Sequence, residues 1–333
     1  LAMSLIWWTV ALIDIHLWPL GLAIGELSPT MVHGPIMLYL VVPSFFFGFL
    51  LTVFPRWLGY PDLEARDYAP AGISFAAAAA LSWAGLWTGS RAAFIGAFCL
   101  ALCGFLAAFA VMLRLLLREQ KDRKGPTWHG WSMLAAVIAA MAGVFCAILF
   151  AVQLDSGWIR LANRIGLLAF ILPVFVTVSH RMIPFFATNV IQGYERWRPF
   201  WILVAYWAVS IALLVAELGE EPHVAAGAAL LLAAITGLMT FKWWPRAAAP
   251  GLFWVLIIAF AWAPVGFALE CLAAMGIQLG RSPDHALTVG FAAGLVIAMV
   301  TRVTQGHSGR PLVMPGLAWL AYSGVQLATL IRV

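Results

Sequence analysis

Charged side chains are scarce in this sequence. Asp, Glu, Lys and Arg make up 10% of its 333 residues, whereas 64% of the residues are hydrophobic. An ordinary soluble domain is about one quarter charged and about half apolar. The shortage of charge excludes a soluble fold. The long apolar runs predict helices that cross a membrane, because a helix satisfies its own backbone hydrogen bonds in lipid.

Cysteine and catalytic motifs are also nearly absent. The four cysteines lie in apolar runs and lack the CxxC spacing of a redox or zinc site, which favours a packing role. There is no P-loop, no HExxH, no GxSxG, no pair of intramembrane carboxylates typical of a dedicated proton pump, and no double-histidine pattern of a cytochrome b subunit. No residue is therefore assigned a catalytic role from the sequence.

Eleven apolar runs are long enough to span a bilayer, whose hydrocarbon core of about 30 Å requires roughly 20 helical residues. They predict an all-α, polytopic transmembrane helix bundle. We expect a single domain over residues 1–333, because the connections are too short for a soluble domain, and we expect the natural chain to be longer. The runs cover residues 3–24, 31–54, 70–89, 92–117, 130–153, 158–180, 199–217, 223–241, 250–272, 284–302 and 312–331.

Basic residues fall almost entirely on one side of this arrangement. Cytoplasmic loops are enriched in Lys and Arg, so alternate threading of the runs predicts that the basic loops face the cytoplasm. The net charge of +5 then reflects topology and not nucleic-acid binding. The basic residues on the predicted cytoplasmic side are Arg56, Arg66, Arg114, Arg118, Lys121, Arg123, Lys124, Arg181, Arg196, Arg198, Lys242, Arg246, Arg302 and Arg310.

The seven histidines are candidates for function, because ionisable groups inside spans are costly and usually mark a ligand or a pathway. His129 and His223 fall in loops and are expected to be solvated. His33, His285 and His16 lie in the outer halves of their spans, and imidazole is the commonest protein ligand of a metal ion. His16 and His285 each have a nearby aspartate that could orient the ring. The alternative is that these are interfacial groups bonded to headgroups or backbone.

A second polar set lies at the predicted cytoplasmic face. His180 and Arg181 end one span, while Arg302, His307 and Arg310 follow the tenth. The arginines could be no more than positive-inside anchors. Two polar centres, one near each face, would instead suit a cofactor pair or a path between the faces.

These polar stretches resemble the NnrS family, which comprises polytopic membrane proteins of denitrifying and other bacteria. The similarity extends over nearly the whole chain. It is carried by VHGPIM at Val32–Met37, GFLLTVFPRWLG at Gly48–Gly59, RMIPFF at Arg181–Phe186, HALTVG at His285–Gly290 and TRVTQGHSGRPL at Thr301–Leu312.

The resemblance implies twelve spans in a bacterial inner membrane, with haem b and copper, and a role in relieving nitrosative stress. The family's second-span pattern resembles His-x-His-Glu-Met. Here His33 stands at the first histidine, while Pro35 and Ile36 replace the second histidine and the acid. The resemblance therefore implies that one metal site is lost or is completed by His16 or His180.

Two hypotheses of different class follow. The first is a haem- and copper-containing protein that binds nitric oxide or helps to turn it over, and so an oxidoreductase is one expected activity. In it, His33 and His285 bind metal at the outer face. At the inner face, Arg181, Arg302 and Arg310 pair with haem propionates, with His180 and His307 as ligands.

The second hypothesis is a membrane subunit or assembly factor of a larger respiratory or nitrogen-cycle complex. In it the histidines are structural, and the helices pack against partner membrane subunits. A transporter is disfavoured because no internal repeat and no matching pair of broken helices is visible.

Overall fold

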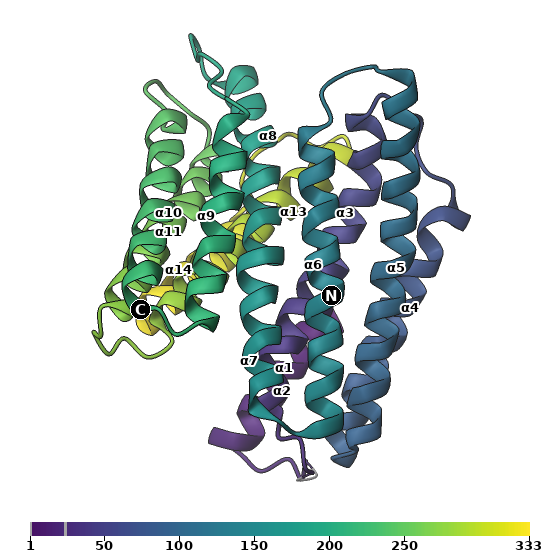
Figure 1. Cartoon of the computed structure of the whole chain (residues 1–333). Coiled ribbons are helices and arrows are strands. Elements are labelled where there is room, and N and C mark those ends of the chain that lie inside the picture. Colours follow the sequence, from purple (N-terminus) through teal and green to yellow (C-terminus); the bar gives the residue numbers. More distant parts are fainter. Residues whose placement is uncertain (1, 23–24) are drawn as a thin grey trace. The chain divides into compact units, whose positions relative to one another are not determined.

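The computed structural model describes residues 2–22 and 25–333, and within them the side chains of residues 2–5, 16 and 307 lie outside the description. Every regular element in these ranges is helical. The chain divides into two compact units (Figure 1). The first ends at Ile171 and the second runs from Leu172 to Val333. Each unit is described by itself.

The first unit is built from antiparallel helices that pack in chain order. α4 packs along α5, α5 along α6, and α6 against α7, as the blue and teal helices of Figure 1 show. The π-helical segments η1 and η2 contact one another. The elements are α1 (Ala2–His16), α2 (Pro29–Ile36), η1 (Met37–Val41), α3 (Val42–Trp57), α4 (Ala65–Thr88), α5 (Arg91–Asp122), α6 (Trp128–Gln153), α7 (Ser156–Arg164) and η2 (Ile165–Ile171).

The second unit centres on α11, which packs against α10, α12, η3 and α13. Its C-terminal helix α14 packs against η3 and α13. The elements are α8 (Leu172–Val190), α9 (Trp201–Leu218), α10 (Pro222–Trp243), α11 (Gly251–Ala274), α12 (Ser282–His285), η3 (Ala286–Ala293), α13 (Gly294–His307) and α14 (Gly316–Arg332).

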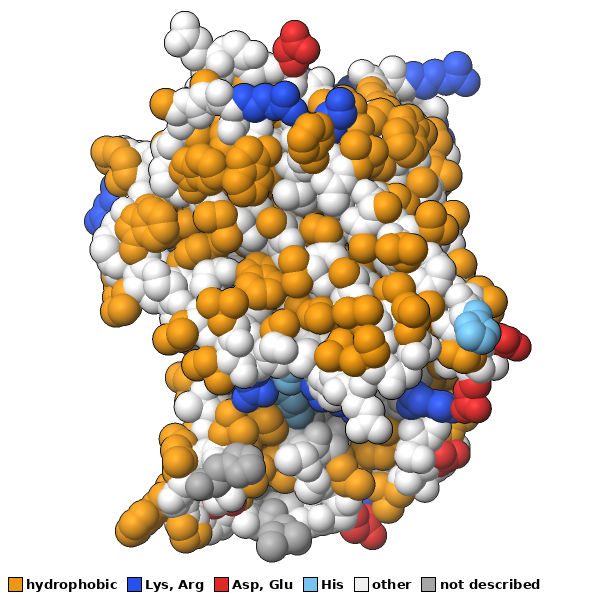
Figure 2. Space-filling model, turned by 90° about the vertical axis from the view of Figure 1, so that its left-hand side faces the viewer, with side chains coloured by type: hydrophobic (Ala, Val, Ile, Leu, Met, Phe, Trp, Pro, Cys, Tyr) orange, Lys and Arg blue, Asp and Glu red, His pale blue; other side chains and the backbone are white. Residues whose placement is uncertain are grey.

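The prediction of an all-α membrane protein is confirmed. Within the described ranges, 9 helices are long and apolar enough to cross a membrane, and they correspond to the second to tenth runs. The first and last runs form α1 and α14, of 15 and 17 residues. Figure 2 shows one face on which hydrophobic side chains prevail in the middle and many charged ones lie toward the ends. The number of spans stays a prediction.

Three of the spans contain π-helical segments, η1, η2 and η3. The π-helix accounts for well under about 1% of residues in proteins and is often found at functional sites. Its hydrogen bonds run one residue further than those of an α-helix, which leaves a carbonyl without its amide at the junction. The hydroxyl of Tyr39 in η1 donates to the carbonyl oxygen of Ala162, near the start of η2, at 2.6 Å.

Tyr39 fits because two glycines leave room for it. It is fully buried, and its ring stacks on Phe170 at 6.2 Å with an interplanar angle of 5°. A Cβ on Gly166 would lie 2.6 Å from the Tyr39 hydroxyl oxygen, and a Cβ on Gly143 would overlap that oxygen. Side chains at these two positions therefore exclude the packing of η1 against η2.

Aromatic side chains form the core of each unit. In the first unit, Phe105 is fully buried and meets Phe47, Phe75 and Phe170 edge to face, at 5.5, 5.2 and 5.5 Å. Such contacts add to the free energy gained by burying apolar area. In the second unit, Phe260, Trp243, Phe291 and Phe175 form the corresponding cluster.

Candidate functional site

His33 lies on α2, in the turn that precedes the π-helical segment η1. It is half-buried, and its ring stacks on Trp8 of α1 with centroids 3.8 Å apart and an interplanar angle of 24°. The next residue, Gly34, lies against α7, since a Cβ there would be 2.5 Å from Oδ1 of Asn163. The imidazole is thus held between an indole face and a close helix contact. The side chain of His16 lies outside the described residues.

His285 of the second unit also precedes a π-helical segment. It ends α12 and stands directly before η3. It is half-buried, and its Nε2 lies 3.3 Å from Nη1 of Arg332 on α14. Arginine has only N–H donors, so Nε2 accepts the hydrogen bond and the ring proton lies on Nδ1. The neighbouring Asp284 carboxylate accepts from Arg281 at 3.2 Å.

Arg332 is a site residue that the sequence did not indicate. It follows the last apolar run and lies 47 positions from His285, so only the packing of α14 brings the two side chains together. No motif around Arg332 marks it as a functional residue.

His180 is a core residue of the second unit. It is 0% exposed, its Nε2 donates to the carbonyl oxygen of Pro199 at 3.1 Å, and the rings of Phe200 and Trp243 lie 6.2 and 6.3 Å away. The hydrogen bond joins α8 to the segment that precedes α9. Nε2 of His180 is therefore engaged in a structural hydrogen bond.

Several arginines lie in the C-terminal halves of α8 and α13 or in the segment that follows α8. The guanidinium carbon of Arg302 lies 3.4 Å from the centre of the Phe186 ring. Arg181 is half-buried, and its charge and that of Arg198 repel one another. Burial and the charge of Arg196 lower the pKa of Arg198. In the described ranges no carboxylate pairs with Arg302 or Arg198, so this end of the unit favours anions.

Arg310 lies in the segment after α13 and is exposed. Its backbone N–H donates to the carbonyl of Gln305 at 3.0 Å. The Gln305 amide side chain also holds the segment, because it bonds to both the backbone oxygen and the backbone nitrogen of Val313, at 2.7 and 3.1 Å. Arg310 thus projects from a fixed turn. The side chain of His307 is outside the description.

Arginines of the first unit have a different environment. The guanidinium of Arg56 binds both carboxylate oxygens of Asp62, each at 2.7 Å, and Arg114 binds Asp67 at 2.6 Å. In the adjoining segment, the Tyr60 hydroxyl donates to Asp122 at 2.7 Å. Burial, together with that bond, raises the pKa of Tyr60 to about 12.

The outer and inner candidates of the second unit are two sites. His285 and Arg302 lie on one helix, 17 residues apart, which is about 25 Å at about 1.5 Å per residue. That is most of the hydrocarbon core of about 30 Å. His33 and His285 belong to different units, each with its own surroundings.

Groups of three or more His, Cys, Asp or Glu side chains that could hold a metal ion do not occur among the residues that the structure describes. His223 is exposed, as expected. His129 was expected to be solvated, and this expectation is wrong. It is 2% exposed, because α6 begins at Trp128 and places it inside the first helical turn, with Trp57 at 6.4 Å.

Membrane-length helices with polar side chains at their ends define a polytopic α-helical membrane protein. Its family is shown by the sequence model described as NnrS protein, which matches residues 1–333. The chain belongs to the NnrS family, and membership relates it to the response to nitric oxide. No curated protein and no solved structure gives a significant match.

Proposed function

We propose that this protein binds haem and uses it to bind nitric oxide or to assist its turnover, which relieves nitrosative stress. The observation that carries the proposal is His285. It is a half-buried imidazole before a π-helical segment, and its Nε2 lone pair points to an arginine donor. That nitrogen is the atom that a haem iron requires. We further propose a bacterial inner membrane with the basic loops in the cytoplasm.

Two residues of the second unit suit two parts of a haem, its iron and one of its propionates. His285 provides an imidazole nitrogen. Arg332, which now donates to that nitrogen, would be released to bind a propionate. Bound haem would supply an iron position that accepts nitric oxide. His285 would hold the iron, while the Arg332 side chain would supply bidentate hydrogen bonds to a carboxylate.

The arginines near the ends of α8 and α13 suit a second anionic group. We propose that they bind the propionates of another haem. Arg302, on the face of Phe186, and the neighbouring Arg181 and Arg310 would hold the carboxylates. His307 or His180 would bind the iron. One haem does not use both ends, because they are about 25 Å apart along the helix.

The described residues suit copper less well than haem. Copper and similar ions are usually held by several nitrogen or sulfur ligands, and the described residues bring no three such groups together. Pro35 and Ile36, where the family pattern has a histidine and an acid, are both buried in α2. His33 and His16 stay candidates for copper, and no step is assigned to it.

The visible spectrum of the purified protein tests the proposal. After reduction with dithionite we expect a Soret band that shifts on addition of nitric oxide. The His285→Ala variant should lose the part of the band that comes from the haem at His285, whereas His223→Ala, which changes an exposed histidine of the same unit, should keep the whole band. A protein without a Soret band would refute haem binding. Equal haem content in both variants would refute the ligand assignment.

The second candidate function is a membrane subunit or assembly factor of a larger complex. The packing of His180 against Pro199, Phe200 and Trp243 favours it, since this histidine has a structural role. Purification in mild detergent separates the two functions. A partner chain retained in fixed ratio, in a preparation free of haem, would support the subunit.

A further inference from the structure

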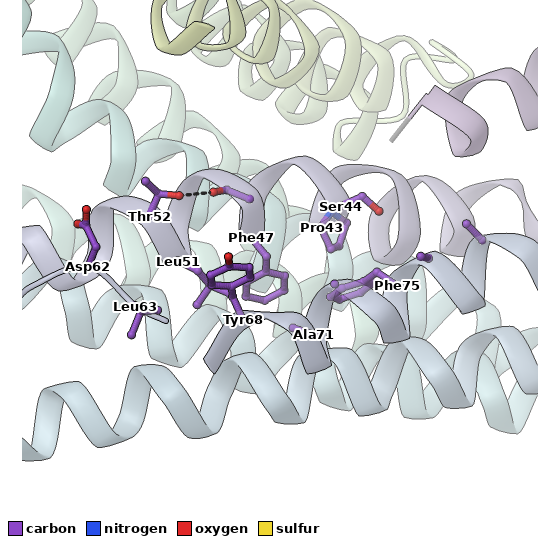
Figure 3. Close-up of a pocket in the computed structure, with 14 residues that line it drawn as sticks. Pro43, Ser44, Phe47, Leu51, Thr52, Asp62, Leu63, Tyr68, Ala71 and Phe75 are labelled. Carbon is purple, nitrogen blue, oxygen red and sulfur yellow. Dashed lines mark hydrogen bonds between the residues drawn. The ribbon is translucent and has the colours of Figure 1, made fainter. Parts of the chain in front are cut away.

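A half-open groove of about 740 Å³ lies between α3 and α4 of the first unit. Its size is typical of ligand sites, which occupy about 300–1,000 Å³. Figure 3 shows Asp62 and Leu63 at one end, Pro43 and Ser44 toward the other, and Tyr68 between them. The two helices are consecutive membrane spans, so most of the groove lies at hydrocarbon depth.

The groove has the length of one leaflet. Its lining runs from Pro43 to Thr52 on α3 and from Tyr68 to Ala79 on α4, which corresponds to about 14–17 Å of helix. The hydrocarbon core is about 30 Å thick. The groove therefore starts at the membrane surface, near the connection that contains Asp62, and ends at the bilayer centre. A spanning helix of a partner would need a groove of twice this length.

The part of the groove beyond Asp62 and Tyr68 is lined mainly by apolar side chains. The hydroxyls of Ser44 and Thr52 donate to backbone carbonyls of their own helix, at 2.5 and 2.8 Å. Phe47 and Phe75 stack at 5.5 Å in the floor. The deeper part of the groove therefore offers mostly apolar contacts. A flexible hydrocarbon chain would restore the close packing that protein interiors require.

The open side of the groove is lined by two glycines, which have no side chain to fill it. Gly48 and Gly72 are exposed, line the groove, and have no atom within 4 Å of an added Cβ. Nothing in the described chain fills this space, and a larger side chain fits there without a clash.

Two ion pairs lie at the membrane-surface end of the groove. Arg56 and Asp62 form a bidentate pair, and Arg66 lies 3.1 Å from Glu64. These two pairs carry no net charge, so they are complementary to a headgroup that also carries both signs. The Tyr68 side chain is 48% exposed beside this end of the groove, with its polar end available to a headgroup.

We propose that this groove binds one acyl chain of a zwitterionic phospholipid from the leaflet on the side of the 58–64 connection. The chain lies between α3 and α4, and the headgroup lies among the matched charges. The site belongs entirely to the first unit, and it is independent of haem and of nitric oxide.

Photo-crosslinking in nanodiscs tests the proposal. The protein would be embedded with phosphatidylethanolamine that carries a diazirine on its acyl chain, and labelled peptides would be mapped by mass spectrometry. We expect labelling concentrated on α3 and α4. The Gly48→Leu and Gly72→Leu variants should each reduce it about fivefold, because the leucine occupies the space of the chain.

Gly227→Leu is the matched control. Gly227 is an exposed glycine of another span, with no atom within 4 Å of an added Cβ and no place in the groove, and labelling of α3 and α4 should be unchanged. Uniform labelling of all helices, or no decrease in the two groove variants, would overturn the site. Preferential labelling by phosphatidylglycerol would overturn the zwitterionic headgroup. Crosslinks between two copies through α3 and α4 would make a second copy the occupant.

Discussion

Five arginines of the first unit pair with carboxylates, whereas those at the α8 and α13 ends of the second unit include two, Arg198 and Arg302, with no carboxylate partner among the described residues. The guanidinium of Arg302 rests instead on Phe186. An unmatched guanidinium in a partly buried place is costly unless an anion joins it. This difference is the reason that we propose an anionic ligand for the second unit and not for the first. The pairs of the first unit include Arg56–Asp62, Arg91–Glu26 and Arg114–Asp67.

Exchanging one arginine in each unit sharpens this contrast and carries the largest expected effect. Arg302→Gln should reduce the haem affinity about tenfold, which corresponds to about 1.4 kcal/mol. Arg56→Gln should leave haem affinity unchanged and cost at most about 1 kcal/mol of stability, since exposed ion pairs contribute little. Haem titration of both variants checks the prediction. Equal losses of affinity would remove the distinction between the units.

Gly166→Ala tests whether the close packing of the first unit depends on space for Tyr39. The added methyl would lie 2.6 Å from the Tyr39 hydroxyl oxygen, and such overpacking costs about 1–3 kcal/mol. Thermal unfolding in detergent should show the loss. Adding Tyr39→Phe should recover part of it, because the closest clashing atom is removed. Gly227→Ala, with open space at its Cβ, should change stability little.

His180→Leu distinguishes a structural histidine from a ligand in the second unit. It leaves the carbonyl of Pro199 without its donor, and a buried unsatisfied acceptor costs about 1–3 kcal/mol. We expect lower thermal stability with unchanged haem content per folded protein. Loss of haem at unchanged stability would instead identify His180 as a ligand.

The smallest expected effect is a pH dependence in the first unit. The folded protein raises the pKa of Tyr60 to about 12, so folding favours the neutral phenol. Its contribution to stability is complete below the unfolded pKa of about 10. It is lost as the pH rises through 12. Unfolding midpoints should therefore fall more steeply for wild type than for Tyr60→Phe over this range. Parallel curves would contradict the assignment.

Much of the helical architecture was predictable because hydropathy reports burial in lipid directly. The second to tenth apolar runs each coincide with one of the nine membrane-length helices of the described residues. The sixth run was predicted to end at residue 180, and this is wrong, because α8 continues to Val190 and His180 and Arg181 do not end the helix. The π-helical segments were not predictable, since they reflect a shift of backbone hydrogen bonds that no apolar pattern encodes. The environment of His129 was also not predictable from the hydropathy pattern. Its loop assignment was wrong because the start of α6 was placed two residues too late.

The candidate site was predictable only in part. Side-chain type and position in the span identified His33, His285, Arg181 and Arg302 as the costly polar groups of the membrane. The contacts of these side chains could not be predicted from the sequence. The stack of Trp8 on His33 and the hydrogen bond from Arg332 to His285 join segments that are far apart in the chain.

The sequence alone determined the membrane environment, the helical class and the family, because composition and local motifs suffice for each. The tertiary structure decided which arginines are neutralised, which histidine is held by an arginine and which by a carbonyl, and where α3 and α4 leave an open groove. These properties depend on contacts between residues distant in sequence. Such contacts are set by the packing of whole helices, not by the pattern within any one of them.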